Sequence, residues 1–320
     1  MMGPILLRRI IWAVDAFQES PESDAIRNRC VDAINALVSE RKAEIEPVYV
    51  VPPQRVNAPF ELLYPPLGFY GGEAESELNK KLRDVHIPGL LPPKVIDKPA
   101  LTTTASIKAL SEYAVETKTD LIVVGTQGRK GVSRLFLGSF AESLLLHSSV
   151  PIFTVGRSTG PIKSFGRILF PTDFRNTSEA IFPRVIELAK SFRATIFIYH
   201  MVSEPLVIPA GFVSPIDMAS FAKDEKQRCA ALASPYLEKA KLADLKTEFT
   251  FEVSPQSESD AILSAAKQKN IGLIAMAAQS GAAASMFAGS TTRQVARSSA
   301  CPVWILHART LAKSIKRKAA

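Results

Sequence analysis

The sequence of 320 residues repeats itself, and this repetition constrains the fold more than any other feature. Residues 8–17 (RRIIWAVDAF) resemble residues 166–175 (GRILFPTDFR), because each is an apolar run that leads to an aspartate. Residues 137–155 resemble residues 288–306, and in both segments a glycine precedes a proline by 13 positions. Self-similarity at a fixed spacing indicates a tandem duplication, here of a unit of about 150 residues.

The segment between the two copies, residues 156–166, is rich in Gly, Ser and Pro, as domain boundaries usually are. We therefore predict a first domain at residues 1–157, a second domain at residues 166–308 and a basic tail at residues 309–320. We refer to the two copies as the first and the second repeat.

Apolar, strand-like runs alternate with helix-like patterns in both repeats. Continuous apolar strands separated by helices indicate a parallel sheet that is covered on both faces. We predict an α/β protein with two tandem, five-stranded, Rossmann-like parallel-sheet domains. In the first repeat the later strands are expected near 47–51, 94–97, 120–124 and 151–155, with helices near 22–42, 73–84, 103–118 and 139–148.

The same alternation continues in the second repeat. Asn176, followed by Glu179, resembles a capping box at the start of a helix, and Ser257 is expected to cap a later helix. Residues 216–242 are expected to form one long helix. Residues 52–71, with many prolines and glycines, are expected to form a long irregular segment that is either functional or mobile.

The net charge of +8 does not indicate a nucleic-acid-binding protein, because five of its cations lie in the last twelve residues. Three distant cysteines and four scattered histidines give no disulfide framework and no metal-ligand spacing. Arg8 and Arg9 interrupt the apolar N-terminus, which we interpret as a first strand and not as a leader peptide. We expect a cytoplasmic protein without a membrane segment and without a nucleic-acid partner.

A glycine-rich segment follows the strand near 120–124. Gly125 and Gly128 come directly after it, and Gly138 and Ser139 then begin a helix. Glycines after a parallel strand allow close approach of a phosphate, and the helix N-terminus offers free N–H groups to an anion. Arg129 and its basic neighbours add positive charge to this loop. Neither a Walker A motif nor a G-x-G-x-x-G motif is present, so other nucleotide sites are not supported.

The spacing G-x2-G-x9-G-[ST] and its flanks, GTQGRKGVSRLFLGS, resemble the ATP-binding signature of the universal stress protein family. Residues 171–202 resemble the family's first strand, helix and second strand. The resemblance extends over residues 8–156 and 166–307. It implies ATP, AMP or ADP as the ligand. The sequence leaves open which nucleotide is preferred and whether Mg²⁺ accompanies it.

The resemblance also assigns roles to individual residues of the first repeat. It implies that Asp15 contacts the adenosine and that Val50 packs on the adenine. Gly125 and Gly128 would lie along the ribose and phosphates, beside the positive charge of Arg129. Phosphate would be bound mainly by backbone N–H groups of the helix start, which comprises Gly138, Ser139 and Phe140. The segment around Asp15, AVDAFQES, departs from the family's usual sequence pattern, which has a proline before the aspartate.

The second repeat has lost most of this signature. Ala277 and Ser280 stand where the first two glycines are expected, and the loop contains neither Arg nor Lys. A methyl group at the first position obstructs a phosphate, and only Gly289 and Ser290 remain of the motif. We expect this repeat to bind ATP weakly or not at all.

We expect a regulator that responds to adenine nucleotide and is read by an unidentified protein partner. One alternative is a slow ATPase or a self-phosphorylating enzyme, although we can assign no catalytic residue and no metal ligand. Another is a structural protein in which each glycine and aspartate only closes a turn. Universal stress proteins often dimerise through their last strand. The resemblance therefore implies that the strands near 151–155 and 302–306 pair within one chain as a pseudo-dimer, and it leaves open a further homodimer.

Overall fold

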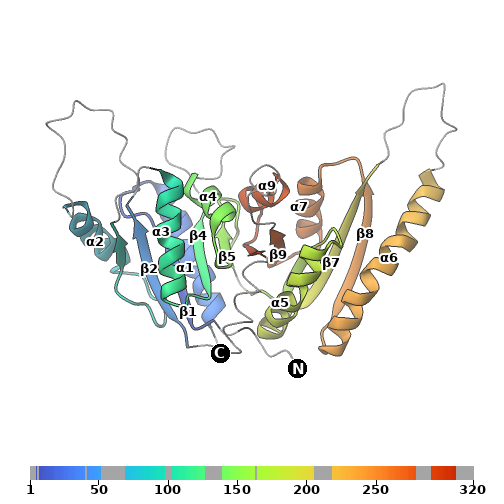
Figure 1. Cartoon of the computed structure of the whole chain (residues 1–320), viewed down its shortest axis with the longest axis horizontal. Coiled ribbons are helices and arrows are strands. Elements are labelled where there is room, and N and C mark those ends of the chain that lie inside the picture. Colours follow the sequence, from blue (N-terminus) through green and yellow to red (C-terminus); the bar gives the residue numbers. More distant parts are fainter. Residues whose placement is uncertain are drawn as a thin grey trace, which may run out of the picture. The chain divides into compact units, whose positions relative to one another are not determined.

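The computed structural model of the protein describes residues 5, 7–39, 42–51, 69–97, 102–126, 139–162, 164–204, 218–278 and 290–307. These residues form two compact units. The first unit comprises the described part of Leu6–Lys163 together with the last helix and strand of the chain. The second unit comprises the described part of Ser164–Ala277 together with Ile5 near the N-terminus. Both are drawn in Figure 1.

The first unit contains a sheet with the strand order β3-β2-β1-β4-β5-β10. Strands β1 to β5 are parallel to their neighbours, and β10 is antiparallel to β5. The strands are β1 (Arg9–Ala13), β2 (Glu44–Val50), β3 (Lys94–Ile96), β4 (Leu121–Gly125), β5 (Ile152–Val155) and β10 (Val303–His307).

Helices cover this sheet because each crossover between parallel strands contains one. The strand order and right-handed crossovers place α1 and α2 on one face and α3 and α4 on the other. Direct packing of α1 on β4 and β5, and of α3 against α4, agrees with this arrangement. The helices are α1 (Pro21–Val38), α2 (Phe69–Leu82), α3 (Thr103–Glu116), α4 (Ser139–His147) and α9 (Ser290–Ser298).

The second unit contains parallel strands in the order β9-β6-β7-β8. Ile5 joins this unit through its backbone N–H, which donates to Ser191 Oγ over 2.9 Å. The strands are β6 (Arg167–Pro171), β7 (Thr195–Ser203), β8 (Thr247–Ser254) and β9 (Leu273–Ala278), and the helices are α5 (Asn176–Phe192), α6 (Met218–Leu242) and α7 (Glu258–Gln268).

The predicted fold class is confirmed: the chain contains two mostly parallel α/β repeats in tandem. The apolar runs predicted the strands to within a few residues, and the helix expected at 139–148 is α4. Of the segment expected to be irregular, residues 69–71 begin α2, and residues 52–68 lie outside the described residues.

One helix start was predicted wrongly. Arg175, not Asn176, is the N-cap residue of α5, and no side chain caps the helix there. Asp173 provides the reason, because its Oδ1 accepts hydrogen bonds from the Arg175 N–H (3.0 Å) and from Ser178 Oγ (2.7 Å). The aspartate thus holds the turn that leads into α5, and the expected capping box at Asn176 is absent. Ser257 does cap α7 as expected, since its hydroxyl accepts from the Asp260 N–H.

The expected pairing of the last strands within one chain is present. Strand β5 lies antiparallel to β10, with Phe153 opposite Trp304. Both side chains are fully buried, and their rings meet edge to face with centroids 5.8 Å apart. The C-terminal helix and strand of the second repeat thus pack in the first unit.

A charged cluster links strand β2 to β1 and to α3 in the first unit. The Arg9 guanidinium lies 2.9 Å from Glu46 and 3.0 Å from Glu44. Tyr113 of α3 donates to Glu46 over 2.9 Å. A nearly buried carboxylate such as that of Glu46 is tolerated only when it is paired and hydrogen-bonded, so this cluster fixes β1, β2 and α3 against one another.

Gly89 is the glycine whose replacement should damage the fold most directly. It has φ of +78°, and an added Cβ would lie 2.0 Å from the carbonyl oxygen of Ala43. Gly89→Ala should therefore lower the free energy of unfolding by about 2 kcal/mol or more. Gly72, inside α2 with nothing within 4 Å of an added Cβ, is the matched control. Gly72→Ala should raise the free energy by about 0.5–1 kcal/mol, and similar effects of the two changes in urea unfolding would contradict this.

Candidate functional site

The strand order of the first unit creates a switch point between β1 and β4. The chain proceeds from β1 to β2 on one side of the sheet and later returns to place β4 on the other side. In open α/β sheets, ligands bind at the carboxyl ends of the strands at such a point. The residues that follow β1, β2 and β4 are therefore the ones to consider.

Asp15 follows β1 at this edge. Its Oδ1 accepts hydrogen bonds from the backbone N–H groups of Phe17 (2.9 Å) and Gln18 (3.1 Å), so the aspartate closes the turn into α1. Among the described residues no group donates to its Oδ2. The turn role that the sequence suggested is therefore present.

Val50 ends β2 at the same level of the sheet as Asp15. Ala13 lies opposite Val48 in the parallel register, so Asp15 and Val50 are each two residues beyond this pair. Val50 is buried in the absence of any ligand. The structure therefore brings these two predicted residues to one edge of neighbouring strands.

Gly125 ends β4, directly beyond the pairing of Ala13 with Val124. A Cβ added here would lie 2.5 Å from Cγ2 of Ile26 and 3.8 Å from Sγ of Cys30, both in α1. A methyl group on a β-branched side chain has little freedom to move away. Close packing of α1 on β4 thus requires glycine at this position, independently of any ligand.

The helix expected to bind phosphate begins at Ser139, as the sequence predicted. Phe140, in the first turn of α4, is half-buried. Gly128, Arg129 and Gly138 lie outside the described residues, so their roles stay predictions. The structure brings Asp15, Val50 and Gly125 to one edge of the sheet.

Two residues near Asp15 were missed by the sequence analysis. Lys81 of α2 donates through Nζ to the carbonyl oxygen of Gln18 over 2.9 Å and so holds α2 against the turn after β1. Gln18 itself has a buried Nε2 without an acceptor among the described residues. A lone glutamine in a turn gives no sequence signal for either feature.

The equivalent edge of the second repeat is built differently. Phe174, which corresponds to Ala16, has a left-handed backbone with φ of 58°. Its ring lies tilted against the ring of His200, with ring centroids 4.8 Å apart, and also meets Tyr236 edge to face. Ala277, which corresponds to Gly125, lies within β9. The loop that follows, residues 279–289, lies outside the described residues.

Cys30 lies beneath Gly125 in the packed layer between α1 and the sheet. Burial raises the pKa of its thiol to about 12, and a hydrogen bond with Trp12 opposes this only in part. A thiol with so high a pKa stays protonated at neutral pH and is a poor nucleophile. Cys30 is therefore a packing residue.

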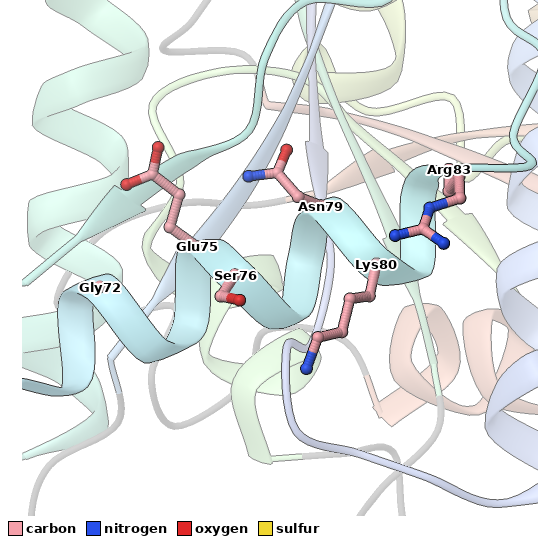
Figure 2. A pocket seen from close by; sticks show the side chains of 6 residues that line it. All are labelled: Gly72, Glu75, Ser76, Asn79, Lys80 and Arg83. Atoms are coloured by element: carbon pink, nitrogen blue, oxygen red, sulfur yellow. The ribbon is translucent and has the colours of Figure 1, made fainter.

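A separate hollow of about 590 Å³ lies along α2. Figure 2 shows that the side chains lining it, including Glu75, Asn79 and Lys80, project from this one helix and from Arg83, which directly follows it. It is the open polar face of a single helix, and it shares no residue with the edge formed by β1, β2 and β4.

Two kinds of site are absent from the described residues. No group of three or more His, Cys, Asp or Glu side chains in this part of the chain is placed to hold a metal ion. Within the same residues, no helix combines the length and the apolar character needed to cross a bilayer.

The comparisons with known proteins all point to one family. The model of the "Universal stress protein family" matches residues 7–156 and again residues 164–307. Universal stress protein MJ0531 of Methanocaldococcus jannaschii is 43% identical over 44 residues, which are 14% of this chain and 26% of that protein. The match to this curated relative thus spans about a quarter of its length.

Solved structures with a similar fold extend over nearly the whole chain. A universal stress protein from Archaeoglobus fulgidus DSM 4304 has a TM-score of 0.58 at 18% identity, covering 93% of this chain and 96% of that one. A functionally unknown protein from Pseudomonas aeruginosa PAO1 has a TM-score of 0.56 at 13% identity, covering 98% and 97%. At these identities the likeness shows the tandem fold alone.

The contact between Gly125 and Ile26 predicts a compensated pair of substitutions. Gly125→Ala should lower the free energy of unfolding by about 1–3 kcal/mol through overpacking. Ile26→Ala should lower it by about 2–5 kcal/mol. The double variant should lose clearly less free energy of unfolding than the sum of the two single losses, because Ile26→Ala removes the Cγ2 atom that the new Cβ at position 125 would contact. Gly156→Ala, whose added Cβ meets only ordinary contacts from 3.5 Å, should be additive with Ile26→Ala. Additivity in both pairs would disprove the packing account.

The Cys30 thiol predicts a loss of stability at high pH. Its pKa rises from 9.0 to about 12 on burial. The contribution of the protonated thiol to the free energy of unfolding is therefore complete below pH 9 and is lost as the pH rises toward 12. Cys30→Ala should therefore reduce the fall in unfolding free energy between pH 8.5 and 11. Parallel pH profiles for the parent and the variant, measured by urea unfolding, would refute this prediction.

Proposed function

Because the chain belongs to the universal stress protein family, we propose that its first repeat binds ATP or a related adenine nucleotide as a regulatory ligand. The observation that supports this most strongly is the convergence of Asp15, Val50 and Gly125 at the carboxyl edge of β1, β2 and β4. The edge lies at the switch point of the sheet, where α/β proteins bind their ligands.

Each part of this edge suits a different part of a nucleotide. Oδ2 of Asp15, to which no described residue donates, can accept hydrogen bonds from ribose hydroxyl groups, and the apolar side chain of Val50 lies at the same level of the sheet. The loop from Gly125 to Ser139 connects β4 to the N-terminus of α4 and has basic residues along it. Free N–H groups at a helix N-terminus and nearby cations attract phosphate.

The second repeat is proposed not to share this role. Its loop, residues 279–289, contains no Arg or Lys, whereas the loop of the first repeat contains several. We also propose that binding serves regulation through a protein partner and not catalysis, since we assign no catalytic base to this edge.

Titration calorimetry with ATP tests the proposal. Gly138→Asp places a negative side chain at the expected phosphate position and should weaken binding at least about tenfold. Gly289→Asp makes the same change at the corresponding position of the second repeat and serves as the matched control. It should leave affinity unchanged. Equal losses in both variants, or no binding by the parent protein, would reject the assignment to the first repeat.

A further inference from the structure

The two strands that join the repeats are related by a local twofold symmetry. In the antiparallel register Phe153 lies opposite Trp304, with Ile152 opposite Ile305 and Thr154 opposite Val303. Phe153 and Trp304 are also equivalent residues of the duplication, since 304 − 153 = 151, the spacing that separates Gly138 from Gly289. Each repeat thus contributes the same position to the centre of the pairing.

A second pair of equivalent residues meets near the same axis. Arg293 of α9 contacts Glu142 of α4 over 2.6 Å, and these residues are again separated by 151 positions. In a symmetric homodimer, an equivalent pair at the axis would be two copies of one residue. Here the duplication has placed an acid opposite a base and a phenylalanine opposite a tryptophan.

Charge therefore favours the pairing of unlike repeats. If the first repeat paired with a second copy of itself, Glu142 would face Glu142, and self-pairing of the second repeat would place Arg293 against Arg293. Like charges in contact are unfavourable, whereas the observed pair is attractive. Both side chains are partly exposed, so the attraction itself is modest and the difference between partners is what matters.

Side-chain size at the axis acts in the same direction. Phe153 and Trp304 are completely buried and fill their space edge to face. Two phenylalanines would leave part of this space empty, and two tryptophans would overfill it. Both departures from native packing are destabilising.

We propose that α4 and β5 of the first repeat form a docking surface matched to α9 and β10 of the second repeat, with Glu142–Arg293 and Phe153–Trp304 as the determinants. These two pairs make the repeats associate with each other in preference to a second copy of either. The occupant of the surface is thus the chain's own C-terminal helix and strand.

Single substitutions in the full-length chain reproduce the contacts of the wrong pairings. Glu142→Arg creates the Arg–Arg contact and Arg293→Glu the Glu–Glu contact, whereas the double variant restores an ion pair in reversed orientation. Each single change should increase the exchange rates of the β5 and β10 backbone amides about twofold to fivefold. The double variant should return to within about twofold of the parent, and high salt should reduce the single effects.

A control variant separates this pair from a general effect of charge. Glu142→Arg combined with Arg297→Glu, one turn further along α9, has the same net charge as the true swap but the wrong partner. Its exchange rates should equal the product of the two single effects. The swap of Glu142 and Arg293 has its own two single effects. If its exchange rates also equal the product of those two effects, the ion pair is not a determinant of the pairing.

The aromatic pair is tested in the same way. Phe153→Trp and Trp304→Phe, which give Trp–Trp and Phe–Phe contacts, should each increase amide exchange in β5 and β10 about tenfold. The exchanged pair, Phe153→Trp with Trp304→Phe, should recover most of this loss. An exchanged pair as perturbed as the product of the singles would overturn the size argument. Thermal unfolding of all variants shows whether each one folds and gives an independent measure of the same coupling.

Discussion

The antiparallel pairing of β5 with β10 is the interaction on which the arrangement of the first unit depends. Without it β5 would present a row of unpaired backbone groups, which is a template for unwanted association. Strand β5 also pairs with β4, and its Val155 lies opposite Gly125. Holding β5 in register therefore also holds the end of β4, where the candidate site begins.

Duplication has allowed the two repeats to diverge on the same backbone plan. Ala16 follows the first aspartate, and its counterpart Phe174 packs its ring on His200 in a left-handed conformation. Such a backbone is unfavourable for a bulky residue and persists only where the surroundings hold it, as the rings of His200 and Tyr236 do here. The two repeats thus use different aromatic residues at this edge, because the first repeat has Ala16 at the position of Phe174 and packs Phe17 edge to face on Tyr49.

The sequence predicted the elements well because buried parallel strands are continuous apolar runs, and the duplication provided two examples of each. It could not predict contacts between distant segments. Ile26 lies 99 positions before Gly125, and nothing in either segment indicates that Ile26 occupies the space that a Cβ at position 125 would need. Arg175, and not Asn176, is the N-cap residue of α5, and its N–H donates to the carboxylate of Asp173. The contact of Glu142 with Arg293 follows from the duplication only once the antiparallel pairing of β5 with β10 is known.

The glycine at 125 shows how a family motif can combine two physical requirements. Its missing Cβ is needed on the face that α1 covers, where Ile26 would otherwise be struck. A ligand at the carboxyl edge would instead use the loop that follows and the start of α4. Glycine at position 125 therefore serves the fold whether or not a nucleotide binds. Gly125 therefore supports the proposed ligand only by its place beside Asp15 and Val50 at the carboxyl edge. The later loop positions, where the two repeats share a glycine at 138 and 289 but differ in charge, are what distinguish the first repeat from the second.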